Sequence, residues 1–300
     1  QLPLSSNPQA SRWTMGFSVL ALLAGISVGT FAIVQTSAGK GSDGVVLIQA
    51  EGKVLLGDPG RELAQRPGAR QAGSSSDRQL RELEAKTALA VKRGLAFLSS
   101  QQNRNGSWVE KIGRKVQHSY RGTVDEHVGV TALATMAFLA SGSSPTRGPY
   151  QKEISRGLDF VLSNVAPNGF ISANESRMYS HAFATLFLAE VYGMSPSDRV
   201  GKKLREAVAL IVDSQNEEGG WRYLPGAEDA DMSISVCQVM ALRAAKNAGI
   251  FVSKTVIDNA ITYVKSSFNT QMRGFNYQHP VGRDGRRRMT RVTFSLTAAG

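Results

Sequence analysis

The sequence predicts an all-α protein built from repeated two-helix units, with a transmembrane helix at its N-terminal end. Two observations predict this fold class. An amphipathic helical segment that ends in a polar turn, a glycine and an aromatic residue recurs four times, at 94–108, 157–171, 207–221 and 260–275. Each copy is followed by a second, apolar segment of helical length. Self-similarity at this spacing indicates stacked helical pairs, none of which can bury its apolar face alone.

Composition sets the limits within which the function is sought. The chain has 300 residues, of which 42% are hydrophobic and 20% charged, so it can bury a sizeable core. Its net charge of +11 favours anionic partners such as lipid headgroups, although solvated surface charge is the commoner cause. The single cysteine, Cys237, excludes an internal disulfide framework and any site built from several thiolates. We expect no metal and no cofactor.

Residues 14–35 contain no charged side chain and follow a short N-terminal flank at 1–13. An apolar helix of about 20 residues can cross the hydrocarbon core of a bilayer. A cleaved signal peptide is the alternative, because small residues follow at 36–38, but the run is longer than the usual apolar region of such peptides. We therefore expect a single-pass membrane anchor. Its flanking charges leave the orientation open, and the extracytoplasmic side is favoured for the folded domain.

Residues 36–78 combine glycine, serine, proline and mixed charge, and they cannot bury enough apolar surface to fold compactly. We expect a flexible linker there and a repeat domain at 79–300. The apolar spacing of Leu80, Leu83 and Leu95 places the first helix at its start. The last apolar run, at 292–298, stops inside a helical pattern, so we expect the repeat domain to be truncated at its C-terminal end.

Each repeat is expected to turn at a glycine and to pack an aromatic side chain over the neighbouring helix. The expected turn glycines are Gly106, Gly169, Gly220 and Gly274, and the expected aromatic residues are Trp108, Phe170, Trp221 and Phe275. The second, apolar helices are expected at 128–140, 180–192 and 233–248, with a fourth beginning at 289.

The polar turns share a pattern: Gln101-Gln102 with Asn105-Gly106-Ser107-Trp108, and Gln215 with Glu218-Gly219-Gly220-Trp221. This pattern resembles the QW-type repeat of squalene-hopene cyclases and protein prenyltransferase β subunits. The segment 179–193 resembles membrane-linked proteins with prenyltransferase/squalene oxidase repeats. The resemblance covers about residues 80–300 and implies an α/α toroid, a ring of alternating inner and outer helices around a cavity. Rings of this family have more than four pairs, which also indicates truncation.

The resemblance directs attention to the start of the helix in 229–242. Terpene cyclases of this type protonate a polyene with the middle acid of an Asp-x-Asp-Asp motif. The apolar match places Asp231 on the first acid and Ser233 on the proton donor, so the donor is missing. A register shifted by two residues places Asp229 on the first acid and makes Asp231 the donor. An aspartate that caps the free amides of a helix is the simpler interpretation of Asp231.

Protein prenyltransferases hold zinc through Asp, Cys and His side chains. Asp231 matches the Asp, but Ser233 stands where the resemblance requires Cys, and Cys237 lies a helical turn further on. A cysteine inside an apolar helix is usually a core residue, so we predict no metal site. His127 and His181, at the starts of other second helices, are candidates for the rim of the ring together with Asp229 and Ser233.

A basic segment near the end of the chain supplies the candidate anion-binding residues, namely Arg283, Arg286, Arg287, Arg288 and Arg291. Guanidinium groups suit phosphate and carboxylate. No aromatic residue interleaves these arginines, as single-strand binding would require, so no nucleic-acid partner is expected. A solvated loop is the alternative interpretation.

Two hypotheses about function follow. In the first, the domain is a membrane-tethered scaffold that binds an isoprenoid or other lipid, or a cell-envelope protein, and has lost the catalytic motifs of its relatives. In the second, it is an isoprenoid cyclase that uses Asp231 as general acid, with aromatic side chains stabilising cationic charge.

Overall fold

The computed structural model describes residues 75–112, 122–280, 285, 288 and 290–299. The expected membrane anchor at 14–35 and nearly all of the expected linker lie outside this part. Helices dominate the described residues, so the all-α prediction is confirmed. In the described part of the chain, no helix combines the length and apolar character needed to cross a membrane.

The described residues contain eight helices and two short hairpins, joined by turns and loops. The helices are α2 (Ser75–Gln101), α3 (Val128–Ala140), α4 (Gln151–Ser163), α5 (Met178–Met194), α6 (Asp198–Asp213), α7 (Met232–Asn247), α8 (Lys254–Ser266) and α9 (Phe294–Ala299). The antiparallel hairpins pair β1 (Val109–Ile112) with β2 (Thr123–Glu126) and β3 (Phe268–Asn269) with β4 (Gly274–Phe275). Helix α2 begins four residues before the expected domain start, and the fourth apolar helix begins at Phe294, not at 289. Helix α5 extends two residues beyond each end of the expected 180–192, and α7 lies one residue earlier than the expected 233–248.

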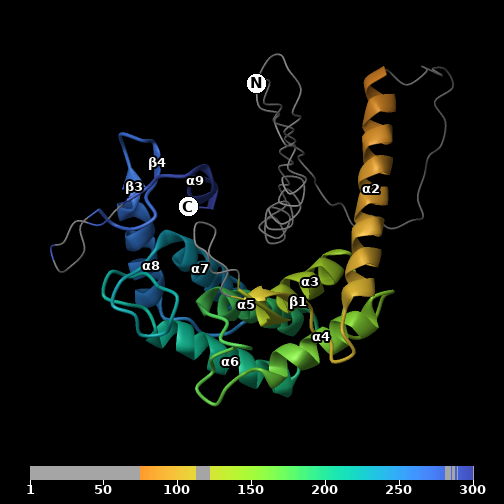
Figure 1. Ribbon diagram of the computed structural model, residues 1–300, viewed down its shortest axis with the longest axis horizontal. Coiled ribbons are helices and arrows are strands. Elements are labelled where there is room, and N and C mark those ends of the chain that lie inside the picture. The colour runs from red at the N-terminus through yellow and green to blue at the C-terminus, as the bar shows by residue number, and fades with distance from the viewer. Residues whose placement is uncertain (1–74, 113–121, 281–284, 286–287, 289, 300) are drawn as a thin grey trace, which may run out of the picture. The chain divides into compact units, whose positions relative to one another are not determined.

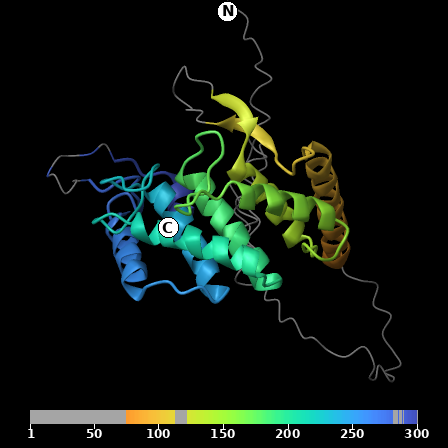
Figure 2. The ribbon, with the colours of Figure 1, turned by 90° about the horizontal axis from the view of Figure 1, so that it is seen from below.

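By its internal contacts the chain divides into two units, and the second, Lys92–Gly300, holds α3 to α9. In this unit α3, α5 and α7 form an inner row, with α5 packed between the other two (Figures 1 and 2). Helix α4 packs on α3, α6 on α5 and α7, and α8 on α7. Helices α3 and α5 are apolar on nearly all sides, whereas α4 and α6 carry a single apolar stripe, as expected for buried and surface helices.

One turn geometry recurs at the joint between successive pairs. Its glycine has a positive φ in all three copies, at Gly106 (+90°), Gly169 (+85°) and Gly219 (+87°). The expected turn glycine Gly220 was therefore wrong by one residue. By the same geometry the buried position after the turn is filled by Trp108, Ile171 and Trp221. Phe170, expected there, lies one residue earlier and is only half-buried.

These glycines are required because each turn lies directly on the backbone of the next outer helix. A Cβ atom at Gly169 would come within 2.1 Å of the carbonyl oxygen of Glu206 in α6, and one at Gly219 within 2.4 Å of that of Asn259 in α8. A glutamine ties the joint: the Gln215 Nε2 group donates to the carbonyl oxygens of Gly219 (3.0 Å) and Val256 (2.9 Å).

Gln102 makes the same two contacts in the first repeat, to the carbonyl oxygens of Gly106 and Glu153. The indole N–H groups of the two tryptophans also make equivalent contacts, from Trp108 to the Leu98 carbonyl oxygen (3.0 Å) and from Trp221 to that of Ile211 (2.7 Å). The glutamine-tryptophan pattern of the sequence is thus a set of structural contacts that fasten one pair of helices to the next.

Candidate functional site

Two of the polar residues singled out in the sequence each lie at the start of an inner helix. Asp231 is the N-cap of α7, and its Oδ1 atom accepts the Ile234 N–H at 2.9 Å. His127 is the N-cap of α3, and its Nδ1 atom accepts the Val130 N–H at 3.3 Å. Arg177 occupies the equivalent position before α5 but makes no side-chain cap. The capping interpretation of Asp231 therefore agrees with its contacts.

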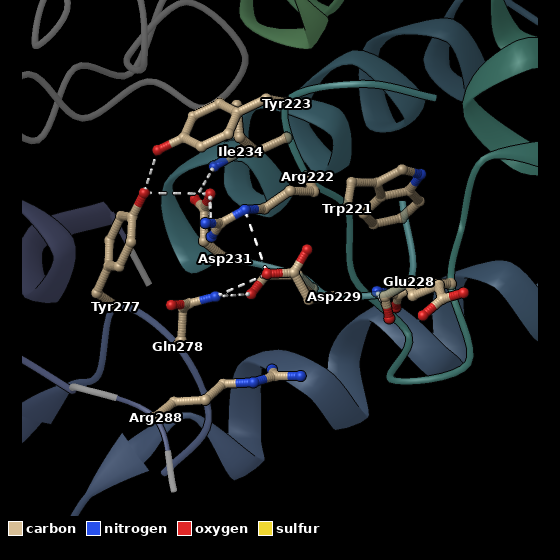
Figure 3. Close-up of polar contacts among 12 residues, drawn as sticks. Trp221, Arg222, Tyr223, Glu228, Asp229, Asp231, Ile234, Tyr277, Gln278 and Arg288 are labelled. Atoms are coloured by element: carbon tan, nitrogen blue, oxygen red, sulfur yellow. Dashed lines mark hydrogen bonds and ion pairs between the residues drawn. The ribbon is translucent and has the colours of Figure 1, made fainter. Parts of the chain in front are cut away.

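Asp231 does more than cap its helix. Its side chain is 0% exposed, and Oδ1 also accepts the Ser233 hydroxyl at 2.5 Å. The Oδ2 atom accepts Nη1 of Arg222 at 3.1 Å and the Tyr277 hydroxyl at 3.3 Å (Figure 3). Four donors thus occupy the lone pairs of the carboxylate. Burial raises the pKa of Asp231, and the hydrogen bonds from Ser233, Ile234 and Tyr277 and the Arg222 charge oppose that rise.

Arg222 joins two carboxylates. Besides its contact with Asp231, its Nε atom lies 3.4 Å from Oδ2 of Asp229. That same Oδ2 atom accepts the Gln278 amide at 3.1 Å (Figure 3). The segment after Trp221 and the segment after β4 are therefore bound to each other through Arg222, Asp229 and Gln278.

Two tyrosines flank Arg222, and each is fixed to the start of an inner helix. The carbonyl oxygen of Tyr223 accepts the first amide of α5, and that of Tyr277 accepts the first amide of α7. Their hydroxyl groups are hydrogen-bonded to each other (Figure 3). Burial raises the pKa of Tyr277, so its phenol stays protonated at neutral pH.

Arginine side chains lie over both tyrosine rings. The Arg222 guanidinium carbon lies 4.7 Å from the centroid of the Tyr223 ring, and that of Arg177 lies 5.9 Å from the same ring. The Arg291 guanidinium carbon lies 4.9 Å from the Tyr277 ring centroid. These distances suit cation-π contacts. We call Arg177, Arg222, Tyr223, Tyr277 and Arg291 the arginine-tyrosine cluster.

Ser233 and Cys237 connect the cluster to the interior of α7. Because the Ser233 hydroxyl donates to Asp231, its oxygen accepts the Tyr179 hydroxyl at 2.6 Å. The Cys237 thiol donates to the Ser233 carbonyl oxygen at 3.3 Å, and burial raises its pKa to about 12. The thiol is therefore protonated and is a poor metal ligand. The part of the chain that the structure describes holds no group of three or more His, Cys, Asp or Glu side chains placed to bind a metal ion.

His181 lies apart from this cluster, in the packed interface between α5 and α6. It is 0% exposed; its Nδ1 atom accepts the Ile171 N–H at 3.1 Å, and Nε2 donates to the Ala207 carbonyl oxygen at 3.2 Å. Thr131 and Ser235 accept the corresponding amides in the other repeats. In the second repeat, His181 thus has the structural role that Thr131 and Ser235 have in the other repeats, namely to accept the backbone N–H of the buried residue after the turn.

The basic segment is divided between two roles. Arg288 forms a two-pronged ion pair with Glu218, with N–O distances of 2.9 and 3.2 Å, and the Glu218 side chain is only 4% exposed. Arg288 therefore fastens the segment to the third turn. Arg291 lies in the arginine-tyrosine cluster, and Arg283, Arg286 and Arg287 lie outside the described residues.

Burial gives His181 a measurable effect on stability. It lowers the pKa of this imidazole to about 4, below the unfolded value near 6.5. The unfolded chain therefore binds the proton more tightly, and stability present above pH 6.5 is lost as the pH falls towards 4. We expect a loss of roughly 2 to 3 kcal/mol over this window in chemical denaturation. In His181→Gln most of this pH dependence should disappear, and an unchanged slope would assign it to other groups.

A scan against protein-family models found no family that matches this chain, and a search of curated proteins found no similar sequence. The functional proposal therefore depends on the residues and contacts described above. Arg222, Tyr223 and Tyr277 were not among the sequence candidates. The repeat spacing is the signal that could have found them, because Tyr223 and Tyr277 lie 54 positions apart and touch, as do Tyr179 and Ser233.

Proposed function

We propose that this chain is a membrane-tethered repeat protein of the terpenoid-cyclase and prenyltransferase type that binds a lipid or a cell-envelope protein and does not catalyse. The recurring joints, with a glycine turn, a clasping glutamine and a buried tryptophan, support the resemblance to the QW-type repeat. The alternation of inner and outer helices is what an α/α toroid would continue. The apolar segment 14–35 supplies the tether in this proposal.

One observation carries the non-catalytic part of the proposal, namely that the Asp231 carboxylate is buried and fully hydrogen-bonded. A general acid must carry a proton and reach the reacting atom of its substrate. The Asp231 carboxylate is 0% exposed, and its acceptor positions are filled by Ser233, Ile234, Arg222 and Tyr277. It serves as a helix cap and as the counter-ion of Arg222. The proton donor of the cyclase motif has no counterpart at Ser233, whose hydroxyl is a weak acid.

Two observations favour the cyclase alternative. Burial raises the pKa of Asp231, which is the direction that a general acid requires, and three tyrosines lie around it. Under this alternative, Asp231 would protonate a polyene after the segment that carries Tyr277 had moved away. Asp231→Asn would then abolish turnover.

The test separates the two functions. The full chain in detergent is incubated with squalene as a linear polyprenoid, and cyclic products are sought by gas chromatography and mass spectrometry. We expect no product above a protein-free control from either the natural chain or Asp231→Asn. In native mass spectrometry of the chain released from its own membranes, we expect a lipid or a protein partner to remain bound. A cyclic product that disappears in a folded Asp231→Asn variant would overturn the non-catalytic proposal.

A further inference from the structure

Two arginines of the arginine-tyrosine cluster carry charge that no neighbouring carboxylate balances. Arg222 is paired with Asp231 and Asp229. Arg177 and Arg291 are exposed, and among the described residues neither lies within ion-pair distance of a carboxylate. Their only described side-chain contacts are with the faces of Tyr223 and Tyr277. One uncompensated cation therefore lies against each of two hydrogen-bonded tyrosines.

The position of Arg177 is unfavourable for the helix that follows it. The amino end of a helix carries partial positive charge, so a cation there is destabilising. The equivalent positions before α3 and α7 are filled by His127 and Asp231, whose side chains accept a helix amide. The Arg177 side chain has no acceptor for a helix amide, so α5 has no side-chain cap. An arginine at this position makes the start of α5 less stable than a capping residue would. Its presence is explained if the Arg177 side chain binds an anion.

Stacking on tyrosine also prepares an arginine for binding. It occupies the face of the guanidinium and leaves its N–H edges for an oxyanion. It also restricts the long side chain before the ligand arrives, so less conformational entropy is lost on binding. A phosphate group suits such a site because several of its oxygens accept charge-assisted hydrogen bonds from guanidinium groups.

We propose that Arg177 and Arg291, supported on Tyr223 and Tyr277, form a cationic surface that binds the phosphate groups of phosphate esters. This inference rests on the proposed binding function and names its ligand chemistry. The ester is either the headgroup of an anionic phospholipid in the membrane that holds the tether or a free, soluble phosphate ester. Arg222 stays with its two carboxylates and fixes the tyrosines, and Arg288 stays with Glu218.

The probe is sn-glycerol 3-phosphate, titrated calorimetrically into the full chain in uncharged detergent at about 0.15 M salt. Each of Arg177→Gln and Arg291→Gln should weaken binding about tenfold, because each removes a charge-assisted contact. The double variant should give no measurable heat. The matched control is Arg243→Gln, which removes an equally exposed arginine from the far end of α7 and should change the affinity by less than about twofold.

Two results would overturn the proposal. The first is a double variant that binds as tightly as the natural chain. The second is an equal loss in Arg243→Gln, which would reduce the effect to net charge. Circular dichroism on each variant checks that these exposed substitutions leave the helices folded.

The source of the phosphate is separated by reconstituting the full chain into phosphatidylcholine vesicles with and without phosphatidylglycerol. Competition by a headgroup predicts at least about fivefold weaker binding of sn-glycerol 3-phosphate when phosphatidylglycerol is present. A soluble ester as natural ligand predicts equal affinity in both. The outcome is also distinct from that of the function test, since cyclic products would reject the non-catalytic function whatever the titration gave, and a failed titration would leave other ligands open to it.

Discussion

Replacing Asp231 by alanine should lower the free energy of unfolding by about 4 kcal/mol, because it removes a helix cap and the closer of the two carboxylates that pair with the partly buried Arg222. The Ile234 amide and the Ser233 hydroxyl lose their acceptor, and the Arg222 guanidinium keeps only its 3.4 Å contact with Asp229. Urea denaturation followed by circular dichroism measures the change, with the denaturation slope checked for two-state behaviour.

Two controls give this result its meaning. Asp231→Asn keeps an oxygen for the Ile234 amide but presents an N–H group towards Arg222, so its loss should be intermediate, about 2 kcal/mol. Asp258→Ala removes an exposed ion pair with Lys254 and should change stability by less than about 0.5 kcal/mol. If Asp231→Ala behaved like Asp258→Ala, the carboxylate would not hold the cluster together.

Gly219→Ala should be equally damaging, lowering the free energy of unfolding by about 4 kcal/mol. A side chain disfavours the φ of +87° at this position, and the added Cβ would lie 2.4 Å from the Asn259 carbonyl oxygen in the backbone of α8. A helix backbone cannot move aside as a flexible side chain can, so the joint between the turn after α6 and the backbone of α8 has to open. The same denaturation experiment measures the loss.

Gly249→Ala is the matched control for the clash. Gly249 has nearly the same φ, +86°, but a Cβ there meets no atom within 4 Å. It should lose only the conformational part, about 1 kcal/mol. Equal losses in the two variants would mean that the turn conformation alone, and not contact with the next helix, makes this glycine necessary.

The inner helices were well predicted because their signal does not depend on tertiary detail. A run such as 128–140 is apolar on all sides, and α3 has the expected bounds. The joints were predicted less well. Gly219 and Gly220 fit the same sequence pattern, and only the backbone conformation distinguishes them. Phe170 was assigned to a buried position that requires an apolar side chain but not an aromatic one, and Ile171 fills it.

The candidate site was half predicted, for a physical reason. A cap such as Asp231 is a local feature, since it precedes its helix in the sequence and binds an amide three residues later. Arg222, Tyr223 and Tyr277 come from irregular segments without periodicity, and they meet only because successive repeats stack. The 54-residue spacing could have paired Tyr223 with Tyr277, but the burial of these positions and the ion pairs of Arg222 depend on neighbours distant in sequence.

The hydrogen bonds between residues 54 positions apart restrict how a chain of this kind can lengthen or shorten in evolution. Tyr179 binds Ser233, and Tyr223 binds Tyr277. A duplication or deletion of one whole repeat would leave each donor facing the counterpart of its former acceptor. The turns at Gly106, Gly169 and Gly219 are nevertheless 63 and 50 positions apart, so repeats of different length share one turn geometry. The stacking contacts thus favour change by complete units or within the loops between the contacts, and disfavour changes inside the helices that carry them.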